Sequence, residues 1–376
     1  MNSLSRTKPN PFLPETELKQ VGSQSHWPSL DIGNVHIGFP VVQAALSGYS
    51  DWAMRIIARR LGASYTLCEV MLDQFVTSVR DNHKNRRFLK VSEEEHPVAA
   101  QLMGAQPEDF GPAAIRLVEA GFDVIDINFG CPVKKVLGRC RGGYLLGQVD
   151  RACEIVARVR DALPAHIPVT VKMRRGIDDS QESRDKFFAI FDGVFAHGAA
   201  GVTVHGRTVK QRYVGPSKWD FLRELKQLAP QRTILGSGDL FTAQSCWDMI
   251  QYTGVDGVTV ARGAIGNPWI FSQVRALALG KPLPDPPGLH EQREILREHF
   301  RLAVEIYGVA SASKRMRKFG IKYSQLHPQS EQVRDAFIKV QDTAQWHAAL
   351  DSWYHDDLPG CPISPVADHN GECGGS

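Results

Sequence analysis

Eight short apolar runs rich in β-branched residues alternate along this chain with longer amphipathic segments, and this alternation constrains the fold more than any other feature. The predicted strands are Phe39–Leu46, Tyr65–Val70, Pro97–Met103, Phe122–Asn128, Ile167–Met173, Ala200–His205, Thr233–Ser237 and Asp256–Ala261. The predicted helices between them are Asp51–Leu61, Pro107–Ala120, Asp150–Leu163, Ser183–His197, Lys218–Leu228 and Thr242–Tyr252. Eight βα units in about 240 residues predict an α/β fold of the (β/α)8, or TIM barrel, type.

A doubly wound open sheet is the alternative fold for such a pattern. That fold usually carries a glycine-rich phosphate-binding turn directly after its first strand. Here the first strand runs into Ser47-Gly-Tyr-Ser-Asp51, which has no G-x-G-x-x-G spacing. The sequence therefore favours the barrel.

The stiff segment Lys281–Gly288 contains four prolines and marks a domain boundary after the barrel. Helical patterns follow over Glu291–Tyr307 and Glu331–Ser352. We therefore expect four parts in the chain. They are a flexible N-terminal leader (1–30), a catalytic barrel (31–284), a small all-helical C-terminal domain (289–355) and a disordered tail rich in Gly, Pro and Asp (356–376).

Composition limits the partners and cofactors. Lys and Arg number 44 against 41 Asp and Glu, so a polyanionic partner would have to meet a local patch of positive charge. The seven cysteines form no C-x-x-C pair, which argues against a metal cage and a disulfide framework. No run of about 18 apolar residues is present, so we expect no membrane span and a reducing, cytoplasmic compartment.

Polar residues stand at the carboxyl ends of the predicted strands, which is the end where TIM barrels place their active sites. Such residues can simply terminate strands, but several of them converging would line one pocket. The ends concerned are Gln101, Asn128, Lys172, His205, Ser237-Gly-Asp239 and Ala261-Arg262. The small-residue turns at Gly238 and Gly263 follow strands seven and eight, where this fold often binds a phosphate group.

Cys131 lies just beyond the fourth strand in Asn128-Phe-Gly-Cys-Pro132. Cysteine is often only a small buried hydrophobe, and we interpret Cys68, Cys153 and Cys246 in that way. The flanking Gly130 and Pro132 instead suggest a presented thiol. Because an ordinary thiol has a pKa of ~8.5, it is mostly protonated at neutral pH and can act as a general acid or as a nucleophile.

Two basic clusters could bind a polyanion. The first follows Cys131 and contains Lys134, Lys135, Arg139 and Arg141 with interspersed glycines. The second, between residues 311 and 322, contains Lys314, Arg315, Arg317, Lys318 and Lys322 and has no acidic residue. Either cluster could also be a solvated surface, which is the commoner role of a charge run.

Taken in order, these motifs resemble the tRNA-dihydrouridine synthases over residues 38–323. The matching segments are Leu46-Ser-Gly-Tyr-Ser-Asp51, Cys68-Glu-Val-Met71, Gln101-Leu-Met-Gly104, Asp126-Ile-Asn-Phe-Gly-Cys-Pro132, Gly142-Gly-Tyr-Leu-Leu146, Val171-Lys-Met-Arg174, Val204-His-Gly-Arg-Thr208, Gly236-Ser-Gly-Asp239 and Arg262-Gly-Ala-Ile-Gly-Asn-Pro-Trp269. The N-x-G-C-P and V-H-G-R-T segments together are highly specific.

The resemblance implies FMN bound at the barrel mouth and reduced by NADPH, with hydride passing to C6 of a tRNA uridine and a proton from Cys131 to C5. It implies flavin contacts from Ala45, Leu46, Ser47, Gln101, Lys172, His205, Ser237, Gly238, Asp239, Ala261 and Arg262. For the tRNA, we expect contacts from Asn128, Lys134, Arg139, Arg141, Arg174, Lys314, Arg315, Arg317 and Lys318. We expect a monomer that uses neither a metal nor a membrane.

Three positions depart from the family pattern. Ala45-Leu46-Ser47 stands where Pro-Met-Ala is usual, Ser237 replaces an asparagine, and Ala261 replaces a glycine. Backbone N–H groups can still bind a phosphate there, whereas a side-chain contact from position 237 is in doubt. Two other functions therefore stay open, a flavin-dependent reductase or dehydrogenase of free pyrimidines and an RNA-binding module without flavin. The modified uridine and the choice between NADPH and NADH also stay open.

Overall fold

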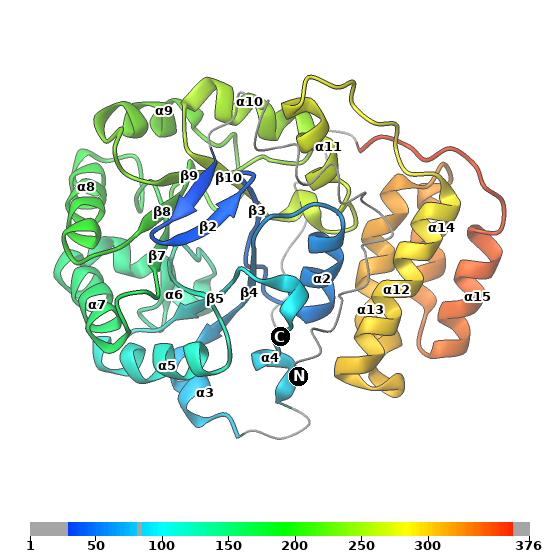
Figure 1. The fold of residues 1–376 in the computed structure, drawn as a ribbon, viewed down its shortest axis with the longest axis horizontal. Helices are drawn as coiled ribbons and strands as arrows, with labels where there is room; N and C mark the ends of the chain where they lie inside the picture. Colours follow the sequence, from blue (N-terminus) through cyan, green and yellow to red (C-terminus); the bar gives the residue numbers. More distant parts are fainter. Residues whose placement is uncertain (1–28, 81–84, 364–376) are drawn as a thin grey trace, which may run out of the picture.

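The computed structural model describes residues 29–80 and 85–363. All eight predicted strands are present and pair in parallel in a closed barrel, in the order β10-β3-β4-β5-β6-β7-β8-β9 (Figure 1). Their bounds are β3 (Val41–Gln43), β4 (Thr66–Leu72), β5 (Val98–Met103), β6 (Val124–Phe129), β7 (Val169–Arg174), β8 (Gly201–His205), β9 (Ile234–Ser237) and β10 (Gly257–Val260). The predicted (β/α)8 barrel is confirmed.

Helices surround the barrel on its outside (Figure 1). The longer ones are α2 (Trp52–Arg60), α5 (Pro107–Glu119), α7 (Val149–Ala162), α8 (Gln181–Ala196), α9 (Trp219–Leu228), α10 (Ala243–Thr253) and α11 (Ile270–Ala278). Short ones are α3 (Asp73–Ser78), α4 (Arg86–Leu89) and α6 (Lys134–Leu137), with 3-10 turns at Glu93–Glu95, Gly142–Gly147 and Arg262–Ala264. The first residue of α5 is Pro107, and Gly254, with φ +72°, caps α10 directly after its last residue, so local sequence signals set both boundaries.

A hairpin that sequence reasoning missed closes one end of the barrel. Strands β1 (Leu30–Ile32) and β2 (Val35–Gly38) pair antiparallel. Leu30 and Ile32 are buried in one apolar cluster with Val42, Leu67 and other barrel residues. Because this end is covered and apolar, chemistry is left to the opposite, carboxyl end. Residues 1–28 of the predicted leader lie outside the described residues.

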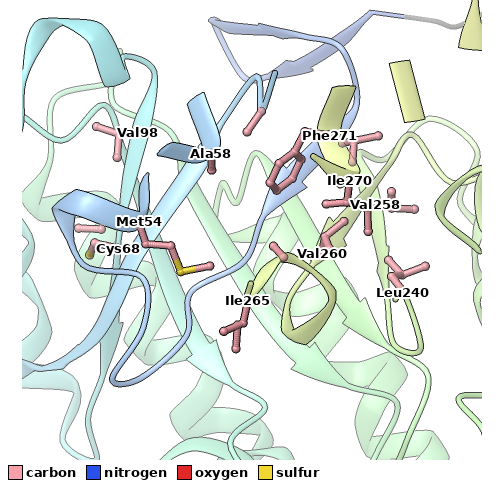
Figure 2. Packing of buried hydrophobic residues seen from close by; sticks show 14 of the residues in the cluster. Met54, Ala58, Cys68, Val98, Leu240, Val258, Val260, Ile265, Ile270 and Phe271 are labelled. Atoms are coloured by element: carbon pink, nitrogen blue, oxygen red, sulfur yellow. The ribbon is translucent and has the colours of Figure 1, made fainter. Parts of the chain in front are cut away.

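The outer faces of the strands pack against the helices. Figure 2 shows Ile270 and Phe271 of α11 against Val258 and Val260 of β10. Thr259, between those two valines, points instead into the barrel, where it lines a small interior cavity. The outward face of the strands is thus apolar, while the inward face carries both polar side chains such as Thr259 and apolar ones such as Val42. Each fully buried large apolar side chain contributes ~1.5–3 kcal/mol.

Beyond the barrel, four helices form a separate layer beside α2 and α11 (Figure 1). They are α12 (Leu289–Tyr307), α13 (Val309–Tyr323), α14 (Ser330–Lys339) and α15 (Thr343–Trp353), with a 3-10 turn at Ser324–Leu326. The predicted single helix Glu331–Ser352 is wrong, because the chain is extended at Val340 and Asp342 caps a new helix by accepting from the Gln345 N–H at 2.8 Å. The break lets Trp346 stack on Phe300.

The helical layer is bonded to the barrel. The Tyr307 hydroxyl donates to Asp51 Oδ2 at 2.7 Å, and Arg60 of α2 pairs with Glu298 of α12 at 2.5 Å. Part of the predicted tail also packs here, since the Cys361 N–H donates to the Leu326 carbonyl at 2.8 Å. Residues 356–363 therefore belong with the helical layer, while 364–376 lie outside the described residues. The division into domains stays a prediction.

Candidate active site at the barrel mouth

The parallel register brings the predicted strand-end residues to one mouth. Asn128 lies level with Lys172, and His205 lies level with both Arg174 and Ser237. Gln101 lies level with Asp126, two residues before Asn128 on the same strand. Because every strand points the same way, their carboxyl ends form one ring of polar groups.

Three hydrogen-bonded side chains, Asp126, Gln101 and Asn128, lead up one side of this ring to Cys131, and we call them the hydrogen-bond file. Gln101 Nε2 donates to Asp126 Oδ2 at 2.7 Å, and Asn128 Nδ2 donates to Gln101 Oε1 at 2.7 Å. Asn128 Oδ1 accepts the N–H groups of Gly130 at 2.9 Å and Cys131 at 3.1 Å. Asn128 therefore holds the backbone that carries the thiol.

Cys131 is half-buried at the mouth, unlike Cys68 and Cys246, which are buried as expected and whose thiol pKa values are raised by burial. Cys153, which we also expected to be buried, is only partly so. The Gly143 N–H donates to the Cys131 carbonyl at 3.0 Å. A Cβ atom at Gly142 would come within 2.9 Å of the Cys131 Cβ. Gly142 and Gly143 thus let the following 3-10 turn pack tightly on the cysteine.

Two cationic side chains, Lys172 and Arg174, lie at the same mouth. Burial lowers the pKa of Lys172 to about 8, reinforced by Arg174 and partly offset by Asp126. Burial also lowers the pKa of Arg174 to about 10. A charge that is desolvated and not fully compensated favours an anionic ligand beside it.

Arg174, which we predicted as a tRNA contact, is buried and engaged with the protein itself. Its guanidinium donates to the carbonyls of Gly130 at 2.9 Å, Thr208 at 2.8 Å and Arg212 at 2.7 Å. These bonds tie the Cys131 loop to the loop after β8. The geometry favours a positioning role over contact with a large substrate.

His205 is held as a neutral imidazole. Burial, followed by Arg174 and Lys172, lowers its pKa well below the ordinary value. The Arg207 N–H donates to His205 Nδ1 at 3.1 Å, so that nitrogen is the acceptor and Nε2 carries the proton. The structure therefore presents one N–H donor from His205 to the mouth.

Two glycine turns after β9 and β10 form the cradle expected for a phosphate. Gly238 has φ +116°, and a Cβ there would lie 2.4 Å from Ser217 Oγ and 3.3 Å from His205 Nε2. A Cβ at Gly263 would lie 2.1 Å from the Leu240 carbonyl oxygen. No other residue fits either position, and the resulting bare backbone can approach an anion closely.

The side chains around this cradle are fixed by one another. Asp239 pairs with Arg207 at 2.7 Å and accepts the Ser217 N–H at 2.7 Å, so its carboxylate is held by the protein. The Arg262 guanidinium lies 4.8 Å from the ring of Tyr213 and 5.0 Å from that of Phe241. Such stacking orients a cation beside the turns. Ser237 is buried, and Ala261 precedes the second turn.

The segment after β3 completes the rim. The Ala44 N–H donates to the Val260 carbonyl at 2.8 Å, which places Ala45, Leu46 and Ser47 next to the β10 turn. The Leu46 N–H donates to Ser50 Oγ at 2.8 Å. These two hydrogen bonds support the segment, which has Ala45 where the resemblance leads us to expect a proline.

The two basic clusters differ in exposure. Lys134 and Arg139 are exposed and Arg141 is partly buried in the segment after Cys131. On α13, Lys314 and Arg317 are exposed, whereas Arg315 lies 4.7 Å from the ring of Tyr307 and Lys318 Nζ lies 4.4 Å from that of Tyr49. The second cluster therefore splits, with one half facing solvent and the other facing the barrel rim.

Sequence reasoning missed the supporting residues Asp126, Arg207, Ser217 and Tyr213. Asp126 and Arg207 stand inside the motifs that we quoted, two residues before Asn128 and two after His205, and this proximity was the available signal. Ser217 and Tyr213 lie in the long segment after β8, where nothing in the sequence indicated contact with the mouth.

Some classes of site are not found in the part of the chain that the structure describes. No group of three or more His, Cys, Asp or Glu residues there is arranged to hold a metal ion. Within the same residues, no helix has the length and apolar character needed to cross a membrane.

Comparison with known proteins decides the family. The sequence profile of the dihydrouridine synthase family matches residues 42–356. The chain belongs to that family. It is 33% identical over 336 residues to the probable tRNA-dihydrouridine synthase of Mycobacterium tuberculosis, covering 86% of this chain and 84% of the relative. It is 32% identical over 330 residues to the tRNA-dihydrouridine synthase B of Xanthomonas campestris, covering 88% and 96%.

Solved structures support the fold alone. A histamine dehydrogenase from Rhizobium superposes with a TM-score of 0.54 at 14% identity, covering 73% of this chain and 50% of that one. A morphinone reductase in complex with tetrahydroNAD superposes with a TM-score of 0.51 at 14% identity, covering 70% and 93%. The family and the class of enzyme, an oxidoreductase, are thus as the motifs predicted.

Proposed function

We propose that this dihydrouridine synthase reduces the C5=C6 bond of uridines in tRNA, using FMN reduced by NADPH and Cys131 as the proton donor. The observation that carries the proposal is the position of Cys131. Its backbone is fixed by Asn128 and Arg174 beside a ring of cations and a bare-backbone cradle. A thiol, an anion site and convergent amides at one barrel mouth suit reduction of a planar, carbonyl-bearing ring.

The mouth suits FMN. The turns at Gly238 and Gly263, with Arg262 beside them, would hold its phosphate. Lys172 would stand next to the pyrimidine part of the flavin ring, where its buried positive charge stabilises negative charge. The His205 Nε2–H would bond a ring heteroatom, whereas Gln101, which the resemblance implied as a flavin contact, is buried and already bonded to Asp126 and Asn128. FMN, when bound, supplies the hydride.

The protein's own part of the reaction is to deliver one proton. The Cys131 thiol would give its proton to C5 of the uracil ring as C6 receives the hydride, so that the double bond is saturated and the thiolate later regains a proton from water. Asn128 and Arg174 keep the loop in place while this happens, by holding the N–H and the carbonyl of Gly130. Exposed Lys134 and Arg139 lie in the segment that follows.

The tRNA would lie across the mouth towards α13. Lys134 and Arg139 are exposed on the barrel side, and Lys314 and Arg317 are exposed on α13. A Cβ at Gly48, on the β3 rim, would lie 3.6 Å from Lys318 Nζ, so α13 borders the mouth directly. A uridine must leave its stack to reach the mouth, and one in a loop is the cheapest to extrude.

Replacing Cys131 by alanine tests the proposal. Cys131→Ala should keep the flavin absorbance of the purified protein and lower dihydrouridine formation in tRNA by at least ~10²-fold, as expected for loss of a general acid. Cys140→Ala, in the same segment, is the matched control and should stay near the activity of the unmodified protein. Equal turnover by Cys131→Ala would refute the assigned role.

The same preparation separates the alternatives. Reduction of free uracil at a rate comparable to that of tRNA would favour a pyrimidine reductase. A protein that binds tRNA but shows no flavin band and takes up no FMN would favour an RNA-binding module. Parallel assays with NADPH and NADH would settle the reductant.

A further inference from the structure

The file of side chains below Cys131 begins deep in the barrel. Thr170 Oγ1 donates to Asp126 Oδ1 at 2.6 Å, and Gln101 Nε2 donates to Asp126 Oδ2 at 2.7 Å. Above them, Asn128 connects Gln101 to the backbone of Cys131. Asp126 is therefore linked through two amide side chains to a loop it does not touch.

The two ends of the file have fixed polarity. At the lower end, both oxygens of the Asp126 carboxyl accept hydrogen bonds, Oδ1 from Thr170 and Oδ2 from Gln101. Burial raises the pKa of this carboxyl, but the two hydrogen bonds and the charge of Lys172 oppose that effect and favour the ionised form, which can only accept. At the upper end, the N–H groups of Gly130 and Cys131 can only donate. Each amide between them has one oxygen and one NH2 group, so a single arrangement satisfies every partner: Gln101 turns its NH2 group to Asp126, and Asn128 turns its oxygen to the loop.

Burial makes the wrong arrangement costly. Asp126 is 2% exposed and Gln101 is 1% exposed, so water cannot replace a lost partner at either residue. Turning one amide would set oxygen against oxygen or NH2 against NH2 in the barrel interior. A buried polar group left unsatisfied costs ~1–3 kcal/mol.

We propose that Asp126 is a positioning residue that sets the direction of this hydrogen-bond file and thereby holds the Cys131 loop in its reactive place. The proposal deepens the proposed function and rests on it only for the part that Cys131 plays in the reaction. The proposal also explains why residue 128 is an asparagine. An amide at 128 is required because residue 126 is a carboxylate.

Exchanging the carboxylate and the amide between positions 126 and 128 tests this directly. Asn128→Asp alone offers the loop its acceptor but gives Gln101 an acceptor on both sides, so one contact must fail. Asp126→Asn alone should be mild, because the new amide can still offer its oxygen to Gln101. In the double variant Gln101 can turn over, donate to the carboxylate at 128 and accept from the amide at 126, so every partner is satisfied again.

The readout is the reactivity of Cys131 in the full-length protein without turnover. Alkylation by iodoacetamide is followed by peptide mass spectrometry from pH 7 to pH 10, with Cys140 as the reference in the same sample. The plateau rates of the two thiolates are compared, so that a shift of the Cys131 thiol pKa by the charge at residue 128 does not enter the ratio. Asn128→Asp should raise the Cys131-to-Cys140 rate ratio at least ~5-fold, the factor expected for a lost hydrogen bond, and the double variant should return it to within ~2-fold of the unmodified protein. Amide hydrogen exchange at Gly130 and Cys131 should follow the same order.

Asp123→Asn is the matched control, since it makes the same chemical change on the residue before β6, where Asp123 accepts from the Val98 N–H. It should leave the ratio unchanged. The proposal is overturned if Asn128→Asp does not raise the ratio, or if Asp126→Asn fails to rescue it while both variants stay folded. Because no turnover is measured, either result is independent of whether the chain makes dihydrouridine.

Discussion

The barrel mouth and the junction between barrel and helical layer both gather basic side chains, but they compensate the charge differently. At the junction, Arg315 faces Tyr307, Glu69 and Asp51, and these groups outweigh its burial and raise the pKa of its guanidinium. At the mouth, burial prevails and lowers the pKa values of Lys172 and Arg174. The junction cation is paired within the protein, whereas the mouth cations favour an anion from outside.

The carboxylates near the mouth explain this difference. Asp239 is paired with Arg207, and Asp126 already accepts from Thr170 and Gln101. At the junction, burial likewise lowers the pKa of Lys318 to about 8, which Arg315 reinforces and Asp51 and Glu69 partly offset. The comparison therefore separates Arg315, whose charge is compensated within the protein, from Lys172 and Lys318, whose burial is not fully offset by their neighbours.

The largest expected effect is a gain in stability on removing the mouth charge. In flavin-free protein at pH 7, Lys172→Met should raise the free energy of unfolding by about 1–3 kcal/mol, because the folded state no longer holds a buried charge. Urea unfolding measures it, with Lys186→Met on α8 as a surface control that should stay within ~0.5 kcal/mol.

The pH dependence of that gain follows from the sign of the shift. The pKa of Lys172 is about 8 in the folded protein and ~10.4 when unfolded, so between these values the unfolded chain binds more protons and stability rises with pH. The penalty is complete below pH 8 and is relieved above it. The advantage of Lys172→Met should therefore vanish near pH 10. A pH-independent gain would show that Lys172 is not the titrating group.

A change at the junction should act in the opposite direction. Arg315→Met removes the partner of Tyr307 and Glu69 and should lower the free energy of unfolding by about 1–2 kcal/mol. Arg317→Met, two residues along α13 and exposed, should change it by less than ~0.5 kcal/mol. If both variants were equally stable, the junction would not depend on Arg315.

The smallest effect concerns the exposed half of α13. Lys314→Ala and Arg317→Ala should each weaken tRNA binding a few-fold and lower the slope of log affinity against log salt concentration by about one. Fluorescence anisotropy across a salt series measures both quantities. Lys186→Ala serves as the control for a cation elsewhere on the surface, and an unchanged slope in the α13 variants would place the tRNA elsewhere.

The sequence was sufficient for elements that a local, repeating pattern of apolar residues determines. The alternation of apolar runs predicted every barrel strand, and the parallel order then placed Gln101, Asn128, Lys172 and His205 at one mouth. It was insufficient where a partner is distant in the chain. The three carbonyls that engage Arg174 come from two loops, so its role could not be read from Val171-Lys-Met-Arg174.

The hairpin and the orientation of the charges on α13 also depend on partners that are distant in the chain. The hairpin at Leu30–Gly38 is short and earns its stability from the barrel end that it covers. The charges on α13 look uniform in sequence, but helix geometry turns Arg315 and Lys318 to the barrel and Lys314 and Arg317 to solvent. The local sequence pattern of a helix or hairpin does not determine which of its faces packs against another element.

The central claim is that the mouth holds its positive charge for a flavin. Unfolding of flavin-free protein is compared with and without saturating FMN at pH 7, for the unmodified chain and for Lys172→Met. FMN should stabilise the unmodified chain by at least ~1 kcal/mol more than the variant, since only the former gains a partner for the buried lysine. Equal stabilisation of both proteins, or none in either, would contradict the account.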